Sequence, residues 1–355
     1  MVNDINKNLL DEITQAVAKK APLRIVGGNS KSFYGRDTGD ADQEVLDLSM
    51  HRGLINYEPS ELVITVRAGT PLKEVEATLA LNNQMLAFEP PAFGDNATLG
   101  GTIACNFSGP RRPYAGAARD FVLGMHLVNG KGELLHFGGE VMKNVAGYDV
   151  SRLQCGALGT LGVILDVSLK ILPRPETELT LTRETNEATA FEVMNRIAGK
   201  PLPLSAAAFD GNMIYMRLSG SEDAVRSAHQ QIGGDAYNKG DEFWLRLKEH
   251  TLPFFSVNKP LWRLSLPQTT SHISLHGKSI IDWGGGLRWY SSDESSEKIR
   301  EVAVKAGGHA TCFRGGDRQQ VFSPLTPALH SLHKNLKQAF DPDGLFNPGR
   351  MYEDF

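Results

Sequence analysis

The sequence predicts an α+β protein of two domains followed by a C-terminal tail. Its 355 residues are enough for about two hydrophobic cores. The first half places short apolar strands beside two glycine-rich turns, whereas the second half alternates strands and helices. A proline-containing stretch over 172–178 separates the two patterns. We therefore expect domains over 1–175 and 176–320, with a terminal helix and tail over 321–355.

The first half begins with apolar residues at helical spacing, from Ile5 to Val17, and Pro22 ends that helix. Val and Ile enrichment and turn residues then indicate strands. The strands are expected at 23–26, 44–48, 62–67, 121–128, 133–137 and 162–172. Thr70 is expected to cap a helix that has Pro71 in its first position and runs to about residue 81.

The second half predicts antiparallel strands covered by helices. The expected strands are 178–185, 204–210, 213–218, 261–266 and 278–283. The expected helices are 188–199, 222–232, 241–249, 294–306 and 327–340. The last helix leads into a tail, 341–350, that is rich in Asp, Pro, Gly and Asn.

Charge and composition exclude several classes of protein. The net charge of −4 and the lack of a Lys/Arg cluster argue against a nucleic-acid partner. No run approaches the ~18 apolar residues of a membrane span, and residues 1–20 do not resemble a signal peptide, so we expect a cytoplasmic protein. Cys105, Cys155 and Cys312 show no paired spacing, so we expect free thiols and neither a metal nor an iron–sulfur site on this chain.

The most informative segment is 96–109, which combines small residues, hydroxyls and Gly100-Gly101 with no charge and no helical period. Bare backbone of this kind lets a flat, phosphorylated ligand lie against main-chain N–H groups. A second glycine turn, Gly27–Ser32, follows a short strand. Its spacing fits neither a phosphate loop of nucleotide triphosphatases nor the G-x-G-x-x-G fingerprint. Two such loops suggest one large cofactor, for which FAD is the leading candidate.

The order of several short motifs supports this interpretation. They are 27–32, 47–49, 63–70, 98–102, 119–124, 143–149 and 156–164. In this order the chain resembles the FAD-binding domain of the vanillyl-alcohol oxidase/PCMH flavoprotein family, over roughly residues 5–175. Three further segments, 107–112, 308–314 and 346–350, extend the resemblance to the FAD-binding E subunits of bacterial glycolate oxidase (glycolate dehydrogenase). The implied fold is a PCMH-type domain of two α/β subdomains with an α+β cap that contains an antiparallel sheet.

The resemblance implies a set of cofactor-binding residues. Gly27, Gly28, Asn29, Ser30 and Lys31 would form a pyrophosphate cradle, and Thr98, Gly100, Gly101 and Thr102 would lie along the diphosphate and ribityl chain. Gly69 is also among the expected cofactor-binding residues. Asn106, Ser108 and Gly109 come nearer the flavin or adenosine, and Gly162, Val163 and Ile164 offer backbone hydrogen bonds. Asn347 and Arg350 belong to a tail that returns to this domain. Because 27–32 has neither His nor Cys and 92–96 has no Cys, we expect non-covalent FAD.

The chemistry is less well marked than the cofactor. Oxidation of a 2-hydroxy acid needs a base for the hydroxyl and a cation for the carboxylate. The metal-binding H-x-G-D-G-N-x-H motif of related dehydrogenases is missing, which leaves His309 and Arg314 as weak catalytic candidates. Ala157-Leu158 also stands where catalytic relatives tend to read Ser-Glu.

Two functions therefore remain open. In one, the chain oxidises glycolate, or a similar 2-hydroxy acid, to glyoxylate. In the other, it is a non-catalytic FAD-carrying subunit that supports the complex or relays electrons. The resemblance implies a catalytic flavoprotein subunit and an iron–sulfur subunit as partners, and through that complex a place at the inner face of the cytoplasmic membrane. A flavin-dependent sugar-nucleotide reductase is a third, weaker alternative.

Overall fold

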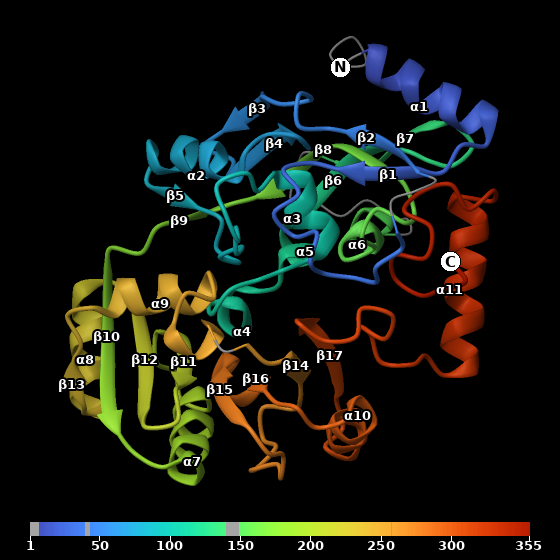
Figure 1. The fold of residues 1–355 in the computed structure, drawn as a ribbon. Helices are drawn as coiled ribbons and strands as arrows, with labels where there is room; N and C mark the ends of the chain where they lie inside the picture. Colours follow the sequence, from blue (N-terminus) through green and yellow to red (C-terminus); the bar gives the residue numbers. More distant parts are fainter. Residues whose placement is uncertain (1–6, 40–42, 140–148, 257) are drawn as a thin grey trace.

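The computed structural model describes residues 7–39, 43–139, 149–256 and 258–355. Two antiparallel sheets dominate it, one from each half of the chain (Figure 1). The five-stranded sheet has the order β3 (Leu54–Glu58), β4 (Val63–Arg67), β8 (Val163–Lys170), β6 (Val122–Val128) and β7 (Leu134–Gly138). The predicted α+β class, with antiparallel sheets, is confirmed.

The second sheet has eight strands, all from the second half of the chain. Their order is β13 (Asp235–Ala236), β10 (Thr177–Glu184), β12 (Met213–Gly220), β11 (Leu204–Phe209), β15 (Lys278–Asp282), β16 (Leu287–Ser291), β14 (Leu261–Ser265) and β17 (His309–Arg314). The change of sheet thus falls between the end of β8 and the start of β10. The domain limits at residues 175 and 320 stay predictions.

Two small sheets and the helices complete the fold. β1 (Leu23–Val26) pairs in parallel with β2 (Glu44–Asp47), and β5 (Gln84–Met85) pairs with β9 (Leu172–Pro173). The helices of the first half are α1 (Lys7–Lys19), α2 (Leu72–Ala80), α3 (Leu99–Cys105), α4 (Arg112–Ala115), α5 (Ala118–Phe121) and α6 (Val150–Gln154). Those of the second half are α7 (Glu187–Ala198), α8 (Glu222–Ile232), α9 (Gly240–Lys248), α10 (Ser296–Lys305) and α11 (Pro327–Phe340).

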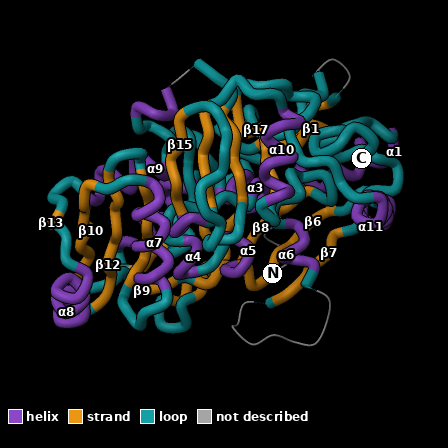
Figure 2. The backbone as a smooth tube through the Cα atoms, turned by 90° about the horizontal axis from the view of Figure 1, so that it is seen from below, coloured by secondary structure: helices purple, strands orange, loops and turns teal. Residues whose placement is uncertain are grey.

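The eight-stranded sheet has an outer and an inner face. Helices α7, α8 and α10 cover the outer face, away from the five-stranded sheet (Figures 1 and 2). The inner face packs against α9 and against side chains of the first half, among them Tyr34 and Phe107. This inner cluster is strongly aromatic, and Phe313 of β17 contacts both of these rings at centroid distances of about 5.5 Å. The inner face is therefore the junction between the two halves of the chain.

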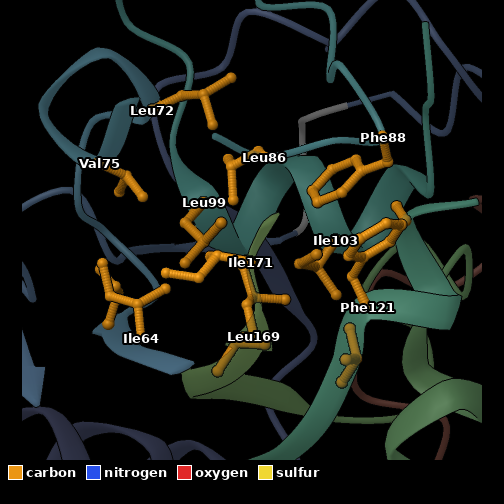
Figure 3. Packing of buried hydrophobic residues seen from close by; sticks show 14 of the residues in the cluster. Ile64, Leu72, Val75, Leu86, Phe88, Leu99, Ile103, Phe121, Leu169 and Ile171 are labelled. Atoms are coloured by element: carbon orange, nitrogen blue, oxygen red, sulfur yellow. The ribbon is translucent and has the colours of Figure 1, made fainter. Parts of the chain in front are cut away.

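A helix forms inside the glycine-rich run, where none was expected. Leu99–Cys105 is α3, and the Thr98 hydroxyl caps it by accepting a hydrogen bond from Gly101 N–H. Leu99 and Ile103 have no exposed surface and point into the core beside the five-stranded sheet (Figure 3). The expectation of no helical period was wrong, because two apolar residues one turn apart and a capping hydroxyl suffice within this packed environment.

Two other parts of the sequence prediction need correction. Thr70 does not cap α2, since its hydroxyl donates to the Arg67 carbonyl at 2.7 Å, and Pro71 occupies the cap position. Strands β3, β16 and β17 were not expected. Strand β16 lies inside the eight-stranded sheet and β17 lies at its edge. Most residues of both short strands are buried, so their sequences show little of the polar alternation that predicts strands.

Buried ion pairs join the two halves. The Arg111 guanidinium bonds Glu89 from the first half and Glu178 from the second, and Arg217 of β12 donates to Glu89 at 2.9 Å. Burial raises the pKa of Glu89, but the two guanidinium groups outweigh it and hold the pKa below its usual range. Each charge thus has an opposite partner, and this network fixes the first half against the sheet.

Candidate functional site

The predicted loops meet around one pocket. It is lined by residues of the Gly27–Ser32 turn that follows β1 (the β1 turn), the start and end of α3, the loop before β8 and the C-terminal tail. The lining residues are Ile25, Val26, Gly27, Gly28, Asn29, Ser30, Lys31, Ser32, Tyr34, Thr98, Gly101, Ala104, Cys105, Leu158, Asn347 and Arg350. Segments more than 300 residues apart in the sequence therefore share one surface. Its cavity of about 110 Å³ suits a diphosphate rather than a whole dinucleotide.

The β1 turn needs glycine at positions 27 and 28 because the segment Asn96–Thr98 lies directly against it. A Cβ atom on Gly28 would lie 1.2 Å from the Asn96 carbonyl oxygen, and one on Gly27 would lie 2.4 Å from the Thr98 hydroxyl. No side chain fits into these gaps, so the two glycine-rich segments lie in direct backbone contact. The pocket is formed by this contact.

The turn presents unused donors and a cation. Within the described ranges, the backbone N–H groups of residues 27–31 meet no hydrogen-bond acceptor, and Asn29 has φ 56°. Successive N–H groups around such a left-handed residue form an anion-binding nest. The Lys31 side chain is 7% exposed and donates to the Ala92 carbonyl and the Ser30 hydroxyl, with no carboxylate of the described chain within ion-pair distance. Burial lowers the pKa of this amine.

The C-terminal tail closes the pocket from the other side. The Asn347 amide accepts from Ile25 N–H at 2.8 Å and donates to the Leu158 carbonyl at 2.7 Å. The Arg350 guanidinium donates to carbonyl groups of Ser32 and Tyr34. Lys337 of α11 supports the tail through the Asp341 carboxylate at 2.7 Å, an ion pair with almost no exposed surface. The tail thus ties the β1 turn to the loop before β8.

Half of the predicted cofactor-binding residues line this pocket and half do not. Those outside it are Gly69, Gly100, Thr102, Asn106, Ser108, Gly109, Gly162, Val163 and Ile164. Gly69 and Gly100 are in close backbone packing, and Thr102 has no exposed surface. Ser108 and Gly109 face a second cavity at the junction between the two halves. Conversely, Tyr34, Cys105 and Leu158 line the pocket although they were not among the predicted cofactor-binding residues, and the fold brings them there.

The two catalytic candidates lie apart. His309 begins strand β17 and Arg314 ends it, which separates their backbones by about 16 Å. This separation does not favour one small carboxylate that contacts both side chains, and the catalytic roles of His309 and Arg314 stay predictions. The Arg314 guanidinium instead lies 5.7 Å from the Phe33 ring centre.

Several further observations bear on the class of protein. Among residues that the structure describes, no group of three or more His, Cys, Asp or Glu side chains is placed to hold a metal ion. Cys105, Cys155 and Cys312 are free. Across those same residues, no helix has both the length and the apolar character needed to cross a bilayer. Residues 143–148 of the predicted motif 143–149 lie outside the described part of the chain.

Comparison with known proteins identifies the class and then the family. Residues 6–138 match the model of a family described as an FAD binding domain. A solved structure of alkyldihydroxyacetonephosphate synthase superposes with a TM-score of 0.70 over 97% of this chain and 75% of that one, at 14% identity, which shows the shared fold. The protein is thus a flavoprotein with FAD as its cofactor.

Two relatives are informative at the level of sequence. The glycolate oxidase subunit GlcE of Escherichia coli (strain K12) is 47% identical over 352 residues, which cover 99% of this chain and 98% of that protein. The glycolate oxidase subunit GlcD of Bacillus subtilis (strain 168) is 33% identical over 160 residues, 44% of this chain and 34% of that protein. The chain belongs to the family of the glycolate oxidase subunit GlcE, a family of flavoprotein oxidoreductases.

The donors of the pocket fit the diphosphate of FAD. Free backbone N–H groups and a buried ammonium without a carboxylate partner favour an anion, and no acidic side chain is among the described lining residues. The residues that would hold it are the 27–31 turn, Thr98, Gly101 and Arg350. When bound, the flavin supplies the hydride-accepting chemistry.

Proposed function

We propose that this chain is the FAD-binding subunit of a complex that oxidises glycolate to glyoxylate and passes the electrons to an iron–sulfur partner. The observation that carries the proposal is the 47% identity to a glycolate oxidase subunit over almost the full length of both chains. The similarity to GlcD over 160 residues supports a second, homologous flavoprotein in the complex. Glycolate, or a closely similar 2-hydroxy acid, is the substrate.

Cofactor binding in this proposal is non-covalent. The turn 27–31 gives backbone hydrogen bonds to the diphosphate, and Lys31 and Arg350 balance its charge. Cys105 is the thiol that lines the pocket, and burial raises its pKa to about 11, which keeps it in the unreactive thiol form. The flavin is therefore expected to leave the protein on denaturation.

The experiment follows the flavin in the purified chain. The yellow absorbance is recorded before and after addition of glycolate without oxygen, and then after the partner subunits are added. Bleaching in the isolated chain supports substrate oxidation by this subunit. A colourless protein that takes up no FAD would contradict the proposal altogether.

A second candidate is a non-catalytic subunit that carries FAD for structure or for electron relay. The separation of His309 from Arg314 supports it, because the two side chains are poorly placed to share one carboxylate. So does Ala157-Leu158, which offers no acidic group beside the pocket. Flavin that stays oxidised with glycolate alone, yet is reduced once the partner subunits are present, would decide for this candidate.

A further inference from the structure

A second cavity lies at the junction, where the segment after α3 meets the inner face of the eight-stranded sheet. Ser108 and Gly109 line it from the first half, and Arg263 and Asp282 line it from strands β14 and β15. Its volume is about 30 Å³, which is room for two or three water-sized groups. Only a very small molecule fits without rearrangement of its walls.

The cavity contains a cation that lacks a counter-ion. The Arg263 guanidinium makes no hydrogen bond or ion pair with any described side chain, and it lies 5.2 Å from the centre of the Trp283 ring. Arg112 lies 4.3 Å from the centre of the same ring but does not line the cavity. Burial lowers the pKa of both guanidinium groups, although arginine keeps its charge in proteins. Arg263 is partly buried, and a partly buried cation without a counter-ion favours an anion at this position.

The cavity also contains an unpartnered hydrogen-bonding group. The Nδ1 atom of His250 is buried and has no partner among the described residues. The ring is held in place by stacking on Phe255 at 4.0 Å and by edge contact with Trp289 at 4.5 Å. Burial, with Arg314 and Arg263 nearby, lowers the pKa of His250 well below its usual value, so the ring is neutral. A neutral imidazole can accept a hydrogen bond from a hydroxyl group.

We propose that this junction cavity binds a two-carbon 2-hydroxy acid, with Arg263 holding the carboxylate and His250 Nδ1 accepting a hydrogen bond from the hydroxyl. The choice of acid rests on the proposed function, whereas the site itself rests on the unpaired cation and the free nitrogen. Phe107, Trp289 and Phe313 line the cavity around these groups, so a two-carbon acid enters only if these walls move slightly, and a longer acid requires a larger movement. Arg263 and His250 replace the pair His309 and Arg314 as the substrate-contacting residues.

Calorimetric titration of the purified chain tests the site. Glycolate is the probe, acetate lacks its hydroxyl, and ethylene glycol lacks its carboxylate. We expect binding of glycolate that weakens at least ~10-fold in Arg263→Met, because a charge-assisted hydrogen bond is lost. The matched control Arg112→Met removes the other cation on the same indole and should change the affinity less than about 3-fold.

The second variant, His250→Phe, keeps the ring stacking and removes the acceptor. The preference for glycolate over acetate should fall to nearly one. Equal glycolate affinity in Arg263→Met and the unaltered chain overturns the inference, as does an unaltered chain that binds no glycolate. Thermal unfolding of each variant verifies that it is folded.

Failure of this inference differs from failure of the proposed function. Glycolate that binds through Arg263 but leaves the flavin oxidised, even with partner subunits present, overturns glycolate oxidation and keeps the binding site. Flavin that glycolate reduces equally well in Arg263→Met and the unaltered chain overturns the site and keeps the proposed function.

Discussion

The adjacent residues Gly100 and Gly101 offer a direct test of the proposed cofactor pocket, because they face different ways in α3. A Cβ atom on Gly100 would lie 2.7 Å from the Ala68 Cβ and 3.0 Å from the Ala68 carbonyl oxygen, inside the packed core. A Cβ atom on Gly101 would meet only the Thr98 hydroxyl, at 3.2 Å, and would project into the pocket.

The expected energies follow from these contacts. In Gly100→Ala, overpacking costs ~1–3 kcal/mol, which exceeds the ~1 kcal/mol that alanine contributes to a helix. The Tm should fall by roughly 2–6 °C. In Gly101→Ala, the fold should be unchanged or slightly stabilised, whereas FAD loses close contact with the backbone. Loss of one or two charge-assisted hydrogen bonds weakens FAD binding by ~10- to 100-fold.

Two measurements distinguish the variants. Flavin absorbance per chain after dialysis gives cofactor retention, and thermal unfolding of the FAD-free protein gives stability without the contribution of bound ligand. We expect Gly101→Ala to lose flavin while keeping its Tm, and Gly100→Ala to lose stability first. Full flavin retention in Gly101→Ala would refute the placement of the diphosphate beside α3.

Three further predictions follow from buried charges. Lys31→Met should weaken FAD binding by at least ~10-fold without lowering the stability of the FAD-free chain, because the buried amine has no carboxylate partner. FAD titration measures the affinity and unfolding of the FAD-free chain measures the stability. Unchanged affinity would contradict the proposed charge pairing. Lys337→Met should lower the free energy of unfolding, measured in urea, by ~3–5 kcal/mol, because it leaves the Asp341 carboxylate buried without its cation. The control Lys334→Met, on the exposed face of the same helix, should lower it by less than ~1 kcal/mol. Burial raises the pKa of Asp282 from 3.8 to about 7, so the folded protein keeps a proton that the unfolded chain releases. Protonated Asp282 contributes up to about 4 kcal/mol to the free energy of unfolding. This contribution is complete below pH ~4 and is lost as the pH rises to ~7. Asp282→Asn should remove this decline. If the free energy of unfolding of the variant falls with pH as it does in the unaltered chain, the assignment to Asp282 is wrong.

Much of the fold could be read from the sequence because its signals are local. The helix Pro327–Phe340 and the strand Leu23–Val26 have the predicted bounds, since a capping Thr326 with Pro327 marks one and turn residues flank the other. The glycine turn after β1 was also recognisable. These patterns depend on neighbours within a few positions, so no knowledge of distant contacts is needed.

The parts that the sequence did not predict depend on distant contacts. Helix α3 forms because Leu99 and Ile103 find a core beside the five-stranded sheet. Arg263 is an ordinary strand residue in the sequence, and only the meeting of two halves leaves its charge without a partner. His309 and Arg314 were candidates by residue type, and the extended strand between them separates them.

By itself, the sequence determined the fold class, the glycine-rich turns and the cofactor, because each is encoded in short runs whose order is diagnostic. The tertiary structure decided which glycine faces the pocket, which cations lack counter-ions and which residues share the junction cavity. The physical reason is that burial and charge pairing are properties of the packed chain. Residues 300 positions apart acquire them only when the tail and the eight-stranded sheet close against the first half.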